Sequence, residues 1–333
     1  MKTITKNFFF LPIIISFMAL GTVGFVAGFP AFLLVTILAI LETTLSFDNA
    51  VMNAKILERM SPLWQRRFLT WGIAIAVFGT RFILPILIVS TALWMSPLYI
   101  TELAFTDAAE YGRLLQSVHG SIAAFGGVFL LMVSLKYFFN KGKEIHWIHS
   151  IEKHLVKWGR VEAIEIALAL VLLTTLSFFT EFNQVQILIA GIVGLILFIL
   201  MEGISGSLSL EAETGGVATA GLTLFVYLNI LDSAFSLDGV VGAFALTTNL
   251  LIIVVGLGIG AYFVRALTLY FVQEKTLTEL TYLEHGAHWA VLGLSMAMLA
   301  NLVIHVPEAI TGLIGLCFVA FSYYSSVREK RLK

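Results

Sequence analysis

Ten stretches of about 20 mostly apolar residues constrain the fold of this chain more than any other feature. A helix needs about that length to cross a membrane. Hydrophobic residues make up 59% of the 333 residues and charged residues only 12%, whereas about a quarter of a soluble domain is charged. The sequence therefore predicts an all-α polytopic membrane protein with about ten transmembrane helices, and it excludes a water-soluble or disordered chain. The stretches cover residues 8–29, 31–54, 69–95, 117–139, 161–180, 185–203, 217–246, 249–272, 285–303 and 306–325.

Basic residues gather in three of the segments outside these stretches and indicate the orientation of the chain. Short cytoplasmic loops carry an excess of lysine and arginine. The loop after the third stretch is acidic, with Glu102, Asp107 and Glu110 against Arg113 alone. Ten spans with both termini in the cytoplasm place all three basic segments inside, so we expect a multi-pass protein of the plasma membrane (the inner membrane of bacteria). The basic segments contain Lys55, Arg59, Arg66 and Arg67; Lys141, Lys143, Lys153, Lys157 and Arg160; and Arg328, Lys330, Arg331 and Lys333.

The same segments predict the domain organisation. Residues 1–139 form an N-terminal membrane half with four spans, residues 140–160 a basic cytosolic linker, residues 161–326 a C-terminal membrane half with six spans, and residues 327–333 a basic cytosolic tail. For the linker we favour an amphipathic helix on the anionic inner leaflet over a metal-sensing site. We expect residues 205–216 to form a cytosolic loop. The histidines of the linker are His146, His149 and His154.

Two of the apolar stretches, the second and the seventh, carry the same acidic motif. In each copy an acid is followed by three residues, a serine, an apolar residue, a second acid and then an amide or a glycine. The two acids are therefore six residues apart in both copies. The motif residues are Glu42, Ser46, Asp48 and Asn49 in the first copy, and Asp232, Ser236, Asp238 and Gly239 in the second.

The stretches that follow each motif also match. A glycine precedes a lone arginine by nine residues in both copies, and the next stretch begins with His-Gly. Spans 2–4 are therefore repeated in spans 7–9, and because five crossings separate the copies, they run in opposite directions. Such an inverted-topology repeat is typical of secondary transporters, whose sites lie at the repeat interface near the midplane. The matched residues are Gly72, Arg81, His119 and Gly120 in one copy, and Gly256, Arg265, His285 and Gly286 in the other.

The repeated charges are too costly to face lipid. An acid at the centre of a spanning helix costs about 2.5–3.5 kcal/mol on insertion scales. We therefore expect all four acids to face the protein interior. Four carboxylates and the two arginines, Arg81 and Arg265, leave two uncompensated negative charges if they share one cavity. One divalent cation or two protons would neutralise that remainder.

The residues of the motif also indicate the kind of ion. Carboxylates, the Asn49 amide and the hydroxyls of Ser46 and Ser236 are oxygen ligands, which suit Mg²⁺, Ca²⁺ and Mn²⁺. We expect local unwinding around the serine and second acid of each copy, which would expose backbone carbonyls. His119 and His285 would favour Mn²⁺ as ligands, but they can equally cap a helix start or relay protons.

The segment Leu45-Ser46-Phe47-Asp48-Asn49 resembles the LSxDN signature of the TerC family of integral membrane proteins. The second copy matches less fully because Gly239 stands in place of the asparagine. Together with the segment from Leu283 to His288, the pattern looks like the DUF475 branch of that family, within the LysE-type transporter group. The resemblance implies inverted halves of three spans each and export of metal ions, chiefly Mn²⁺. Carried over to this sequence, the acids implied to bind metal are Glu42, Asp48, Asp232 and Asp238, with Asn49 beside them.

These observations predict a membrane transporter that exports a divalent cation, Mn²⁺ or else Ca²⁺, with proton exchange as an option. Glu42, Asp48, Asn49, Asp232 and Asp238 would bind the ion as transported substrate, and no resident cofactor is expected. Arg81 and Arg265 would balance charge in the empty state. One alternative is a proton-coupled exporter of an amino acid or other small organic ion held by the arginines. Another is a membrane factor that helps to metallate exported proteins and transports nothing.

Other classes of protein are disfavoured. A net charge of −1 indicates no nucleic-acid partner. The single cysteine, Cys317, excludes a disulfide framework. Gly256, Gly258 and Gly260 lie inside an apolar stretch, so we expect close helix packing there rather than nucleotide binding. An intramembrane aspartyl pair would leave the arginines unexplained, so we expect no enzyme. The expected partners are the cation and the lipid bilayer, with a homo-oligomer left open.

Overall fold

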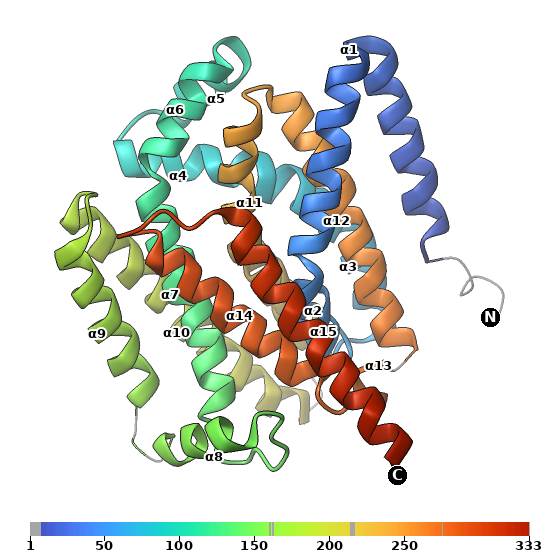
Figure 1. Cartoon of the computed structure of the whole chain (residues 1–333), viewed down its shortest axis with the longest axis vertical. Coiled ribbons are helices and arrows are strands. Elements are labelled where there is room, and N and C mark those ends of the chain that lie inside the picture. The colour runs from blue at the N-terminus through green and yellow to red at the C-terminus, as the bar shows by residue number, and fades with distance from the viewer. Residues whose placement is uncertain (1–7, 160, 162, 214–216, 275, 333) are drawn as a thin grey trace. The chain divides into compact units, whose positions relative to one another are not determined.

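The computed structural model describes residues 8–159, 161, 163–213, 217–274 and 276–332. Every regular element among these residues is a helix (Figure 1). The helices are α1 (Phe10–Leu45), α2 (Phe47–Leu57), α3 (Pro62–Ala74), the π-helix η1 (Ile75–Ile83), α4 (Leu84–Leu93), α5 (Pro97–Thr106), α6 (Ala108–Ser117), α7 (His119–Phe138), α8 (His149–Trp158), α9 (Ile164–Phe179), α10 (Gln184–Glu213), α11 (Val217–Leu246), α12 (Leu250–Gln273), α13 (Thr276–Glu279), α14 (Leu283–Ala300) and α15 (Glu308–Leu332).

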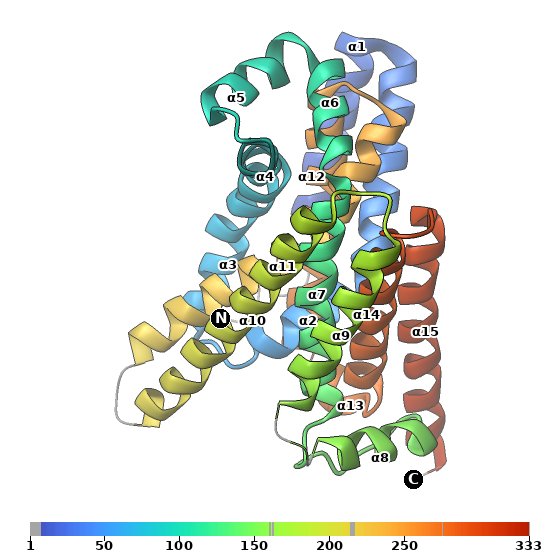
Figure 2. The same ribbon diagram turned by 90° about the vertical axis from the view of Figure 1, so that its left-hand side faces the viewer.

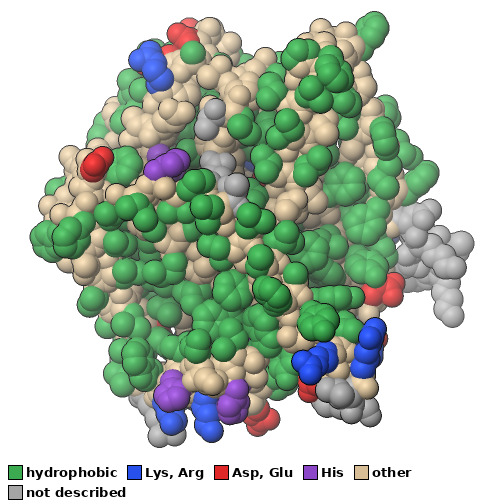
Figure 3. Space-filling view, viewed as in Figure 1, with side chains coloured by type: hydrophobic (Ala, Val, Ile, Leu, Met, Phe, Trp, Pro, Cys, Tyr) green, Lys and Arg blue, Asp and Glu red, His purple; other side chains and the backbone are tan. Residues whose placement is uncertain are grey.

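Seven helices of the described chain are long and apolar enough to cross a membrane. The predicted class, an all-helical multi-pass membrane protein, is therefore confirmed, while the count of ten spans stays a prediction. Figure 3 shows mainly hydrophobic side chains on the visible face of α15, with charged side chains near its carboxyl end. The seven segments are Phe10–Leu45, Pro62–Leu93, His119–Phe138, Gln184–Gly203, Gly221–Phe244, Leu250–Gln273 and Ile310–Arg331.

The chain forms two compact units, and neither is continuous in sequence. Unit 1 contains Met1–His119 and Leu228–Thr276, and unit 2 contains Gly120–Tyr227 and Leu277–Lys333. The predicted division of the chain at residues 140–160 stays a prediction. Every charged residue of the two acidic motifs, and both arginines that follow them, belongs to unit 1.

Helix α1 of unit 1 consists of two arms joined at Gly28. This glycine has a φ of 84° and a ψ of 175°, a backbone conformation that strongly favours glycine. Pro30 follows and cannot donate a hydrogen bond back into the first arm. The chain therefore reverses here, as Figure 1 shows for the two arms of α1. The sequence placed the boundary between its first two apolar stretches at the same point.

Glycines of α12 let that helix approach the second arm of α1. A Cβ atom at Gly256 would lie 2.6 Å from the Leu38 Cβ, and one at Gly260 would lie 2.5 Å from the Glu42 Cβ. Both distances are too short for real contacts, so a side chain at either position would push the helices apart. The expectation of close helix packing by small residues is met at these two positions.

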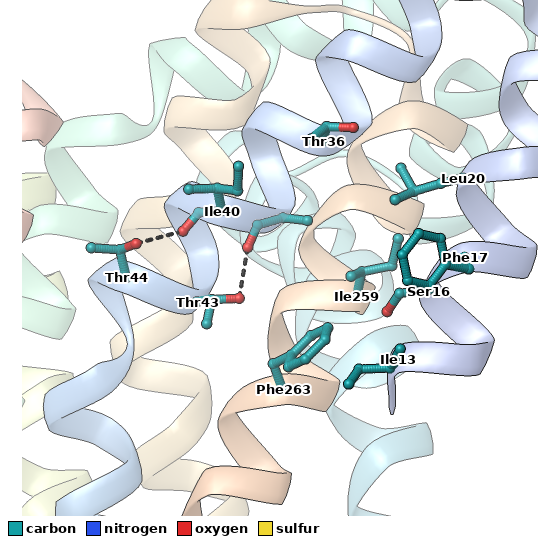
Figure 4. A pocket seen from close by; sticks show the side chains of 11 residues that line it. Ile13, Ser16, Phe17, Leu20, Thr36, Ile40, Thr43, Thr44, Ile259 and Phe263 are labelled. Carbon is teal, nitrogen blue, oxygen red and sulfur yellow. Dashed lines mark hydrogen bonds between the residues drawn. The ribbon is translucent and has the colours of Figure 1, made fainter. Parts of the chain in front are cut away.

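A cavity of about 360 Å³ lies between the two arms of α1 and α12 (Figure 4). Its lining is mainly apolar and includes Phe17 and Phe263. The hydroxyls of Thr43 and Thr44 donate to carbonyls one turn earlier in α1, so their hydrogen atoms are already used within the helix. None of the acids or arginines of the repeated motifs lines this cavity.

Unit 2 is built around α14 and α15, which pack closely. A Cβ at Gly286 of α14 would lie 2.0 Å from the Ser322 Oγ, and one at Gly293 would lie 2.4 Å from the Ile314 Cγ2. Figure 2 shows α8 lying crosswise to α15 in this unit. Helix α10 continues to Glu213. The expectation of a loop over residues 205–216 is therefore wrong for residues 205–213, which are helical. Residues 214–216 lie outside the described part of the chain.

The glycine contacts predict a difference between two neighbouring alanine substitutions in α12. Gly260→Ala brings its new methyl group against Glu42, so we expect a loss of about 1–3 kcal/mol of stability from overpacking. Gly258→Ala is the matched control, because a Cβ there meets only Val77, at an ordinary 3.4 Å. Thermal unfolding in detergent should show a lowered midpoint for Gly260→Ala alone. Equal midpoints would contradict the close approach of α1 and α12.

Candidate intramembrane charge site

Two acid–arginine pairs lie buried in unit 1, one from each copy of the repeated motif. Arg81 pairs with Glu42, and the Arg265 Nη2 lies 3.0 Å from the Asp232 Oδ2. All four residues are at most 5% exposed. Each arginine therefore neutralises the first acid of its own copy, as expected for charges that cannot face lipid.

The π-helix η1 sets the position of Arg81. The Arg81 Nη1 donates to the carbonyl of Ala76, five residues earlier, at 2.7 Å. The Nη2 also lies 3.4 Å from the Ser236 Oγ of α11. Helical segments of the π type are rare and occur often at functional sites. The sequence predicted an ordinary helix here, and nothing in its apolar pattern signals the wider turns.

Arg265 occupies a space that a glycine leaves open. A Cβ at Gly72 would lie 2.6 Å from the Arg265 Nη1. The guanidinium also lies 4.1 Å from the centre of the Phe68 ring, and its Nη1 donates to the Phe68 carbonyl at 3.3 Å. The glycine that the repeat placed nine residues before Arg81 thus makes room for the arginine of the other copy.

The two motif helices meet in an antiparallel register. Glu42 lies opposite Gly239, since a Cβ at that glycine would be 3.2 Å from the Glu42 Oε2. Seven residues later along the first motif, the Asn49 Nδ2 donates to the Asp232 Oδ1 at 2.7 Å. Because the partner position moves from 239 back to 232, α1 and α2 run opposite to α11 where they face it.

Asp48 lies in the first turn of α2, immediately after a one-residue irregularity at Ser46. The hydroxyl of Ser46 donates to the Glu42 carboxylate at 3.3 Å. Asp48 is 3% exposed and forms no ion pair with another described residue. The helix dipole favours a carboxylate in this first turn. Asp48 is therefore a buried acid without a described cation partner, one residue before the Asn49 that donates to Asp232.

The expected local unwinding occurs only in part. In the first copy it is confined to Ser46, and backbone hydrogen bonds continue from Ser46 to Glu42 and from Ala50 to Ser46. In the second copy α11 runs unbroken through Ser236 and Gly239, so the expectation of unwinding there is wrong. The carboxylates of Glu42 and Asp232 accept side-chain hydrogen bonds in this region, from Ser46 and Arg81 and from Asn49 and Arg265 respectively. The side chain of Asp238 lies outside the described part of the structure.

The two repeated histidines belong to different units. His119 begins α7 at the boundary of unit 1. His285 belongs to unit 2, where its Nδ1 lies 2.9 Å from the Glu152 Oε2. Among the described residues, no group of three or more His, Cys, Asp and Glu side chains is arranged to hold a metal ion. The described residues include the linker histidines His146, His149 and His154.

Glu152 is the residue of unit 2 that the sequence analysis missed. It is fully buried although it lies on α8, the amphipathic helix of the predicted linker. The Glu152 carboxylate accepts a hydrogen bond from the Trp289 Nε1 of α14 at 2.9 Å, and it lies 2.9 Å from the Lys143 Nζ. The Nζ in turn lies 4.0 Å from the centre of the Tyr137 ring. Helix α8 is thereby fixed to α14, which an acid in a polar linker gave no reason to expect.

These contacts change the acid–base properties of the pair. Burial alone would raise the pKa of Glu152, but the hydrogen bonds from His285 and Trp289 and the ion pair with Lys143 outweigh burial and hold that pKa well below its ordinary value. Burial lowers the pKa of Lys143, and its contact with Glu152 opposes that effect. Glu152 therefore stays ionised at any physiological pH.

The architecture and the buried charges define a multi-pass membrane protein with an ion-pair network inside its membrane-spanning helices. Residues 47–333 match the family DUF475, described as a protein of unknown function. The chain therefore belongs to the DUF475 family. The match begins one residue before Asp48 and includes α2, η1, α11 and α12. No curated protein and no solved structure matches the chain.

The buried pairs predict strong coupling between Glu42 and Arg81. Arg81→Met leaves Glu42 buried and uncompensated, so we expect a loss of about 3–5 kcal/mol, and Glu42→Gln added to it should cost less than the two losses summed. The exposed pair of Lys330 and Glu279, each 60% exposed, is the control and should couple by about 0–1 kcal/mol. Additive losses at Glu42 and Arg81 in a double-mutant cycle would show that they are not paired.

The Glu152 contacts predict a pH-dependent contribution to stability. Because its pKa is lowered on folding, Glu152 stabilises the folded state above its unfolded pKa of about 4.3, and this contribution declines as the pH falls below that value. Glu152→Gln should therefore cost about 3 kcal/mol at neutral pH. Unfolding midpoints of the two proteins should converge below about pH 4. A difference that grows toward acid pH would contradict the lowered pKa.

Proposed function

We propose that the protein transports a divalent cation through the charged site of unit 1, with Mn²⁺ as the first candidate and Ca²⁺ as the second. The observation that carries the proposal is Asp48, a buried acid without a described ion-pair partner in the same motif as the closed pair of Glu42 and Arg81. Intramembrane ionisable residues mark ion pathways as a rule. The resemblance of the motif to the TerC family supports the metal as substrate.

The contacts of unit 1 support an inverted repeat. In the alignment of the two motifs, Glu42 corresponds to Asp232, and Asn49 corresponds to Gly239. The contact of Glu42 with Gly239 therefore corresponds to the contact of Asp232 with Asn49. A contact that maps onto another when the copies are exchanged is what a two-fold relation between them produces. Such a relation is typical of secondary transporters.

The arginines would act as exchangeable counter-ions. In the described state Arg81 forms an ion pair with Glu42, and Arg265 forms one with Asp232. A cation held by Asp48 and Asn49 would compete with the two arginines for the carboxylates of Glu42 and Asp232. Asp238 would bind the cation as well. Entry of the cation would then release the arginines, and its departure would restore the ion pairs. Protons are the natural counter-substrate, because they neutralise the same carboxylates. We further propose that both termini face the cytoplasm of a plasma membrane.

The pairing of the arginines argues against the organic-solute alternative. An exporter that holds an anionic substrate group with arginine needs a guanidinium that faces the substrate. Here both guanidinium groups are bonded to acids of the protein. We therefore rank the metal ion first, and we keep the organic ion and the metallation factor as outcomes of the experiment.

Flux through liposomes tests the proposal. Wild-type protein should carry Mn²⁺ or Ca²⁺ into vesicles that enclose an indicator dye, and a pH gradient should change the rate if protons are exchanged. Asp48→Asn removes the unpaired buried charge, so we expect at least a roughly tenfold loss of flux. Glu102→Gln, which alters an exposed acid, is the control and should retain the wild-type rate. Folded wild-type protein without flux of either ion would refute the proposal.

A further inference from the structure

The polar surface of α2 extends one turn beyond the charged site to Asn53. Asn53 is 1% exposed, and neither its Oδ1 nor its Nδ2 has a hydrogen-bond partner in the described structure. A buried amide left unpaired costs free energy, and such a group calls for an explanation such as water or an ion. Asn53 follows Asn49 by four residues, so both side chains lie on the same face of α2.

Asn49 presents an oxygen toward the same region. Its Nδ2 donates to the Asp232 carboxylate, which accepts hydrogen bonds only. The remaining amide atom must therefore be the Oδ1, and this oxygen is buried without a partner in the described structure. Asp232 is itself bonded to Arg265, so the orientation of the Asn49 amide is fixed.

The antiparallel register places a third asparagine at the level of Asn53. Glu42 faces Gly239 and Asn49 faces Asp232, so one further turn along α2 corresponds to one turn back along α11. That turn contains Asn229, which is also buried. The register thus brings two amide side chains to one level, immediately beyond the charged site.

At the opposite end of the charged site, the equivalent positions carry no amide side chains. Exchange of the two copies, by the motif alignment, carries Asn53 to Ala243 and Asn229 to Ala39. Both alanines are buried. The repeat is therefore polar on the side where α2 ends and apolar on the other. The loop that follows α2 carries the basic residues assigned to the cytoplasm.

We propose that Asn53 and Asn229 form an entry station, at which a divalent cation exchanges part of its water for amide oxygens on the way to Asp48. The inference rests on the proposed function and adds to it the side from which the cation enters the charged site. The station opens the charged site toward the end of α2, and the alanine level closes it on the other side. Oxygen ligands without charge suit a transient stop, because they hold a hard cation more weakly than carboxylates do.

Asn53→Ala tests the station in the liposome assay, because it copies the residue of the other repeat. Loss of one oxygen ligand should raise the KM for Mn²⁺ about tenfold while the maximal rate stays within about twofold. The increase should appear when Mn²⁺ is supplied from the side of the loop after α2, a side fixed by protease cleavage of that loop. The thermal midpoint should not fall, since Asn53 has no hydrogen bond to lose.

Two variants control for other effects of the substitution. Thr268→Val removes a buried hydroxyl of α12 in the same unit and should leave the KM for Mn²⁺ unchanged. Asn53→Asp keeps an oxygen ligand and should retain or lower that KM. This variant also tests the station if Asn53→Ala does not fold. An unchanged KM in Asn53→Ala, or an equal increase from both sides, would overturn the station while wild-type flux and its loss in Asp48→Asn uphold the transporter. Absence of wild-type flux would overturn both.

Discussion

Burial of charge within an apolar helix bundle is the constraint on which the rest of unit 1 depends. Lipid offers no hydrogen bonds, so each intramembrane ion needs a partner supplied by the protein. Glu42 and Asp232 obtain theirs from Arg81 and Arg265. To place these long side chains, the fold uses a π-helix that contains Arg81 and a glycine gap beside Arg265. The packing of four helices thus follows from two ion pairs.

A second buried carboxylate organises unit 2 by the same rule but with a different result. Glu152 gathers donors from the linker and from α14, and it converts a polar amphipathic helix into part of the packed structure. The two units therefore share a principle, in which a buried acid determines which helices must remain together. In unit 1 one such acid, Asp48, is left without a described counter-ion, and the proposed cation site rests on this difference.

The sequence predicted the features that depend on composition and periodicity. It did not predict which of several possible partners a buried polar side chain would contact. The helical class, the break near Gly28 and the burial of the charged residues follow from the cost of polar groups in lipid. The identity of the partners does not. Nothing in the repeat indicated that Gly72 would accommodate Arg265, that His285 would bind Glu152, or that α11 would stay unbroken. These outcomes depend on how helices rotate against each other, and an apolar pattern leaves that rotation open.

The π-helix has a consequence for the repeat itself. Glycine and arginine are nine residues apart in both copies, but the path passes through η1 in the first copy and through regular α-helix in the second. Wider turns advance the chain by a smaller angle per residue, so equal spacing gives the two arginines different directions from their glycines. Gly72 therefore faces an arginine while Gly256 faces Leu38. Sequence symmetry and structural symmetry separate at this segment, so an equal spacing of glycine and arginine gives the two arginines unequal surroundings.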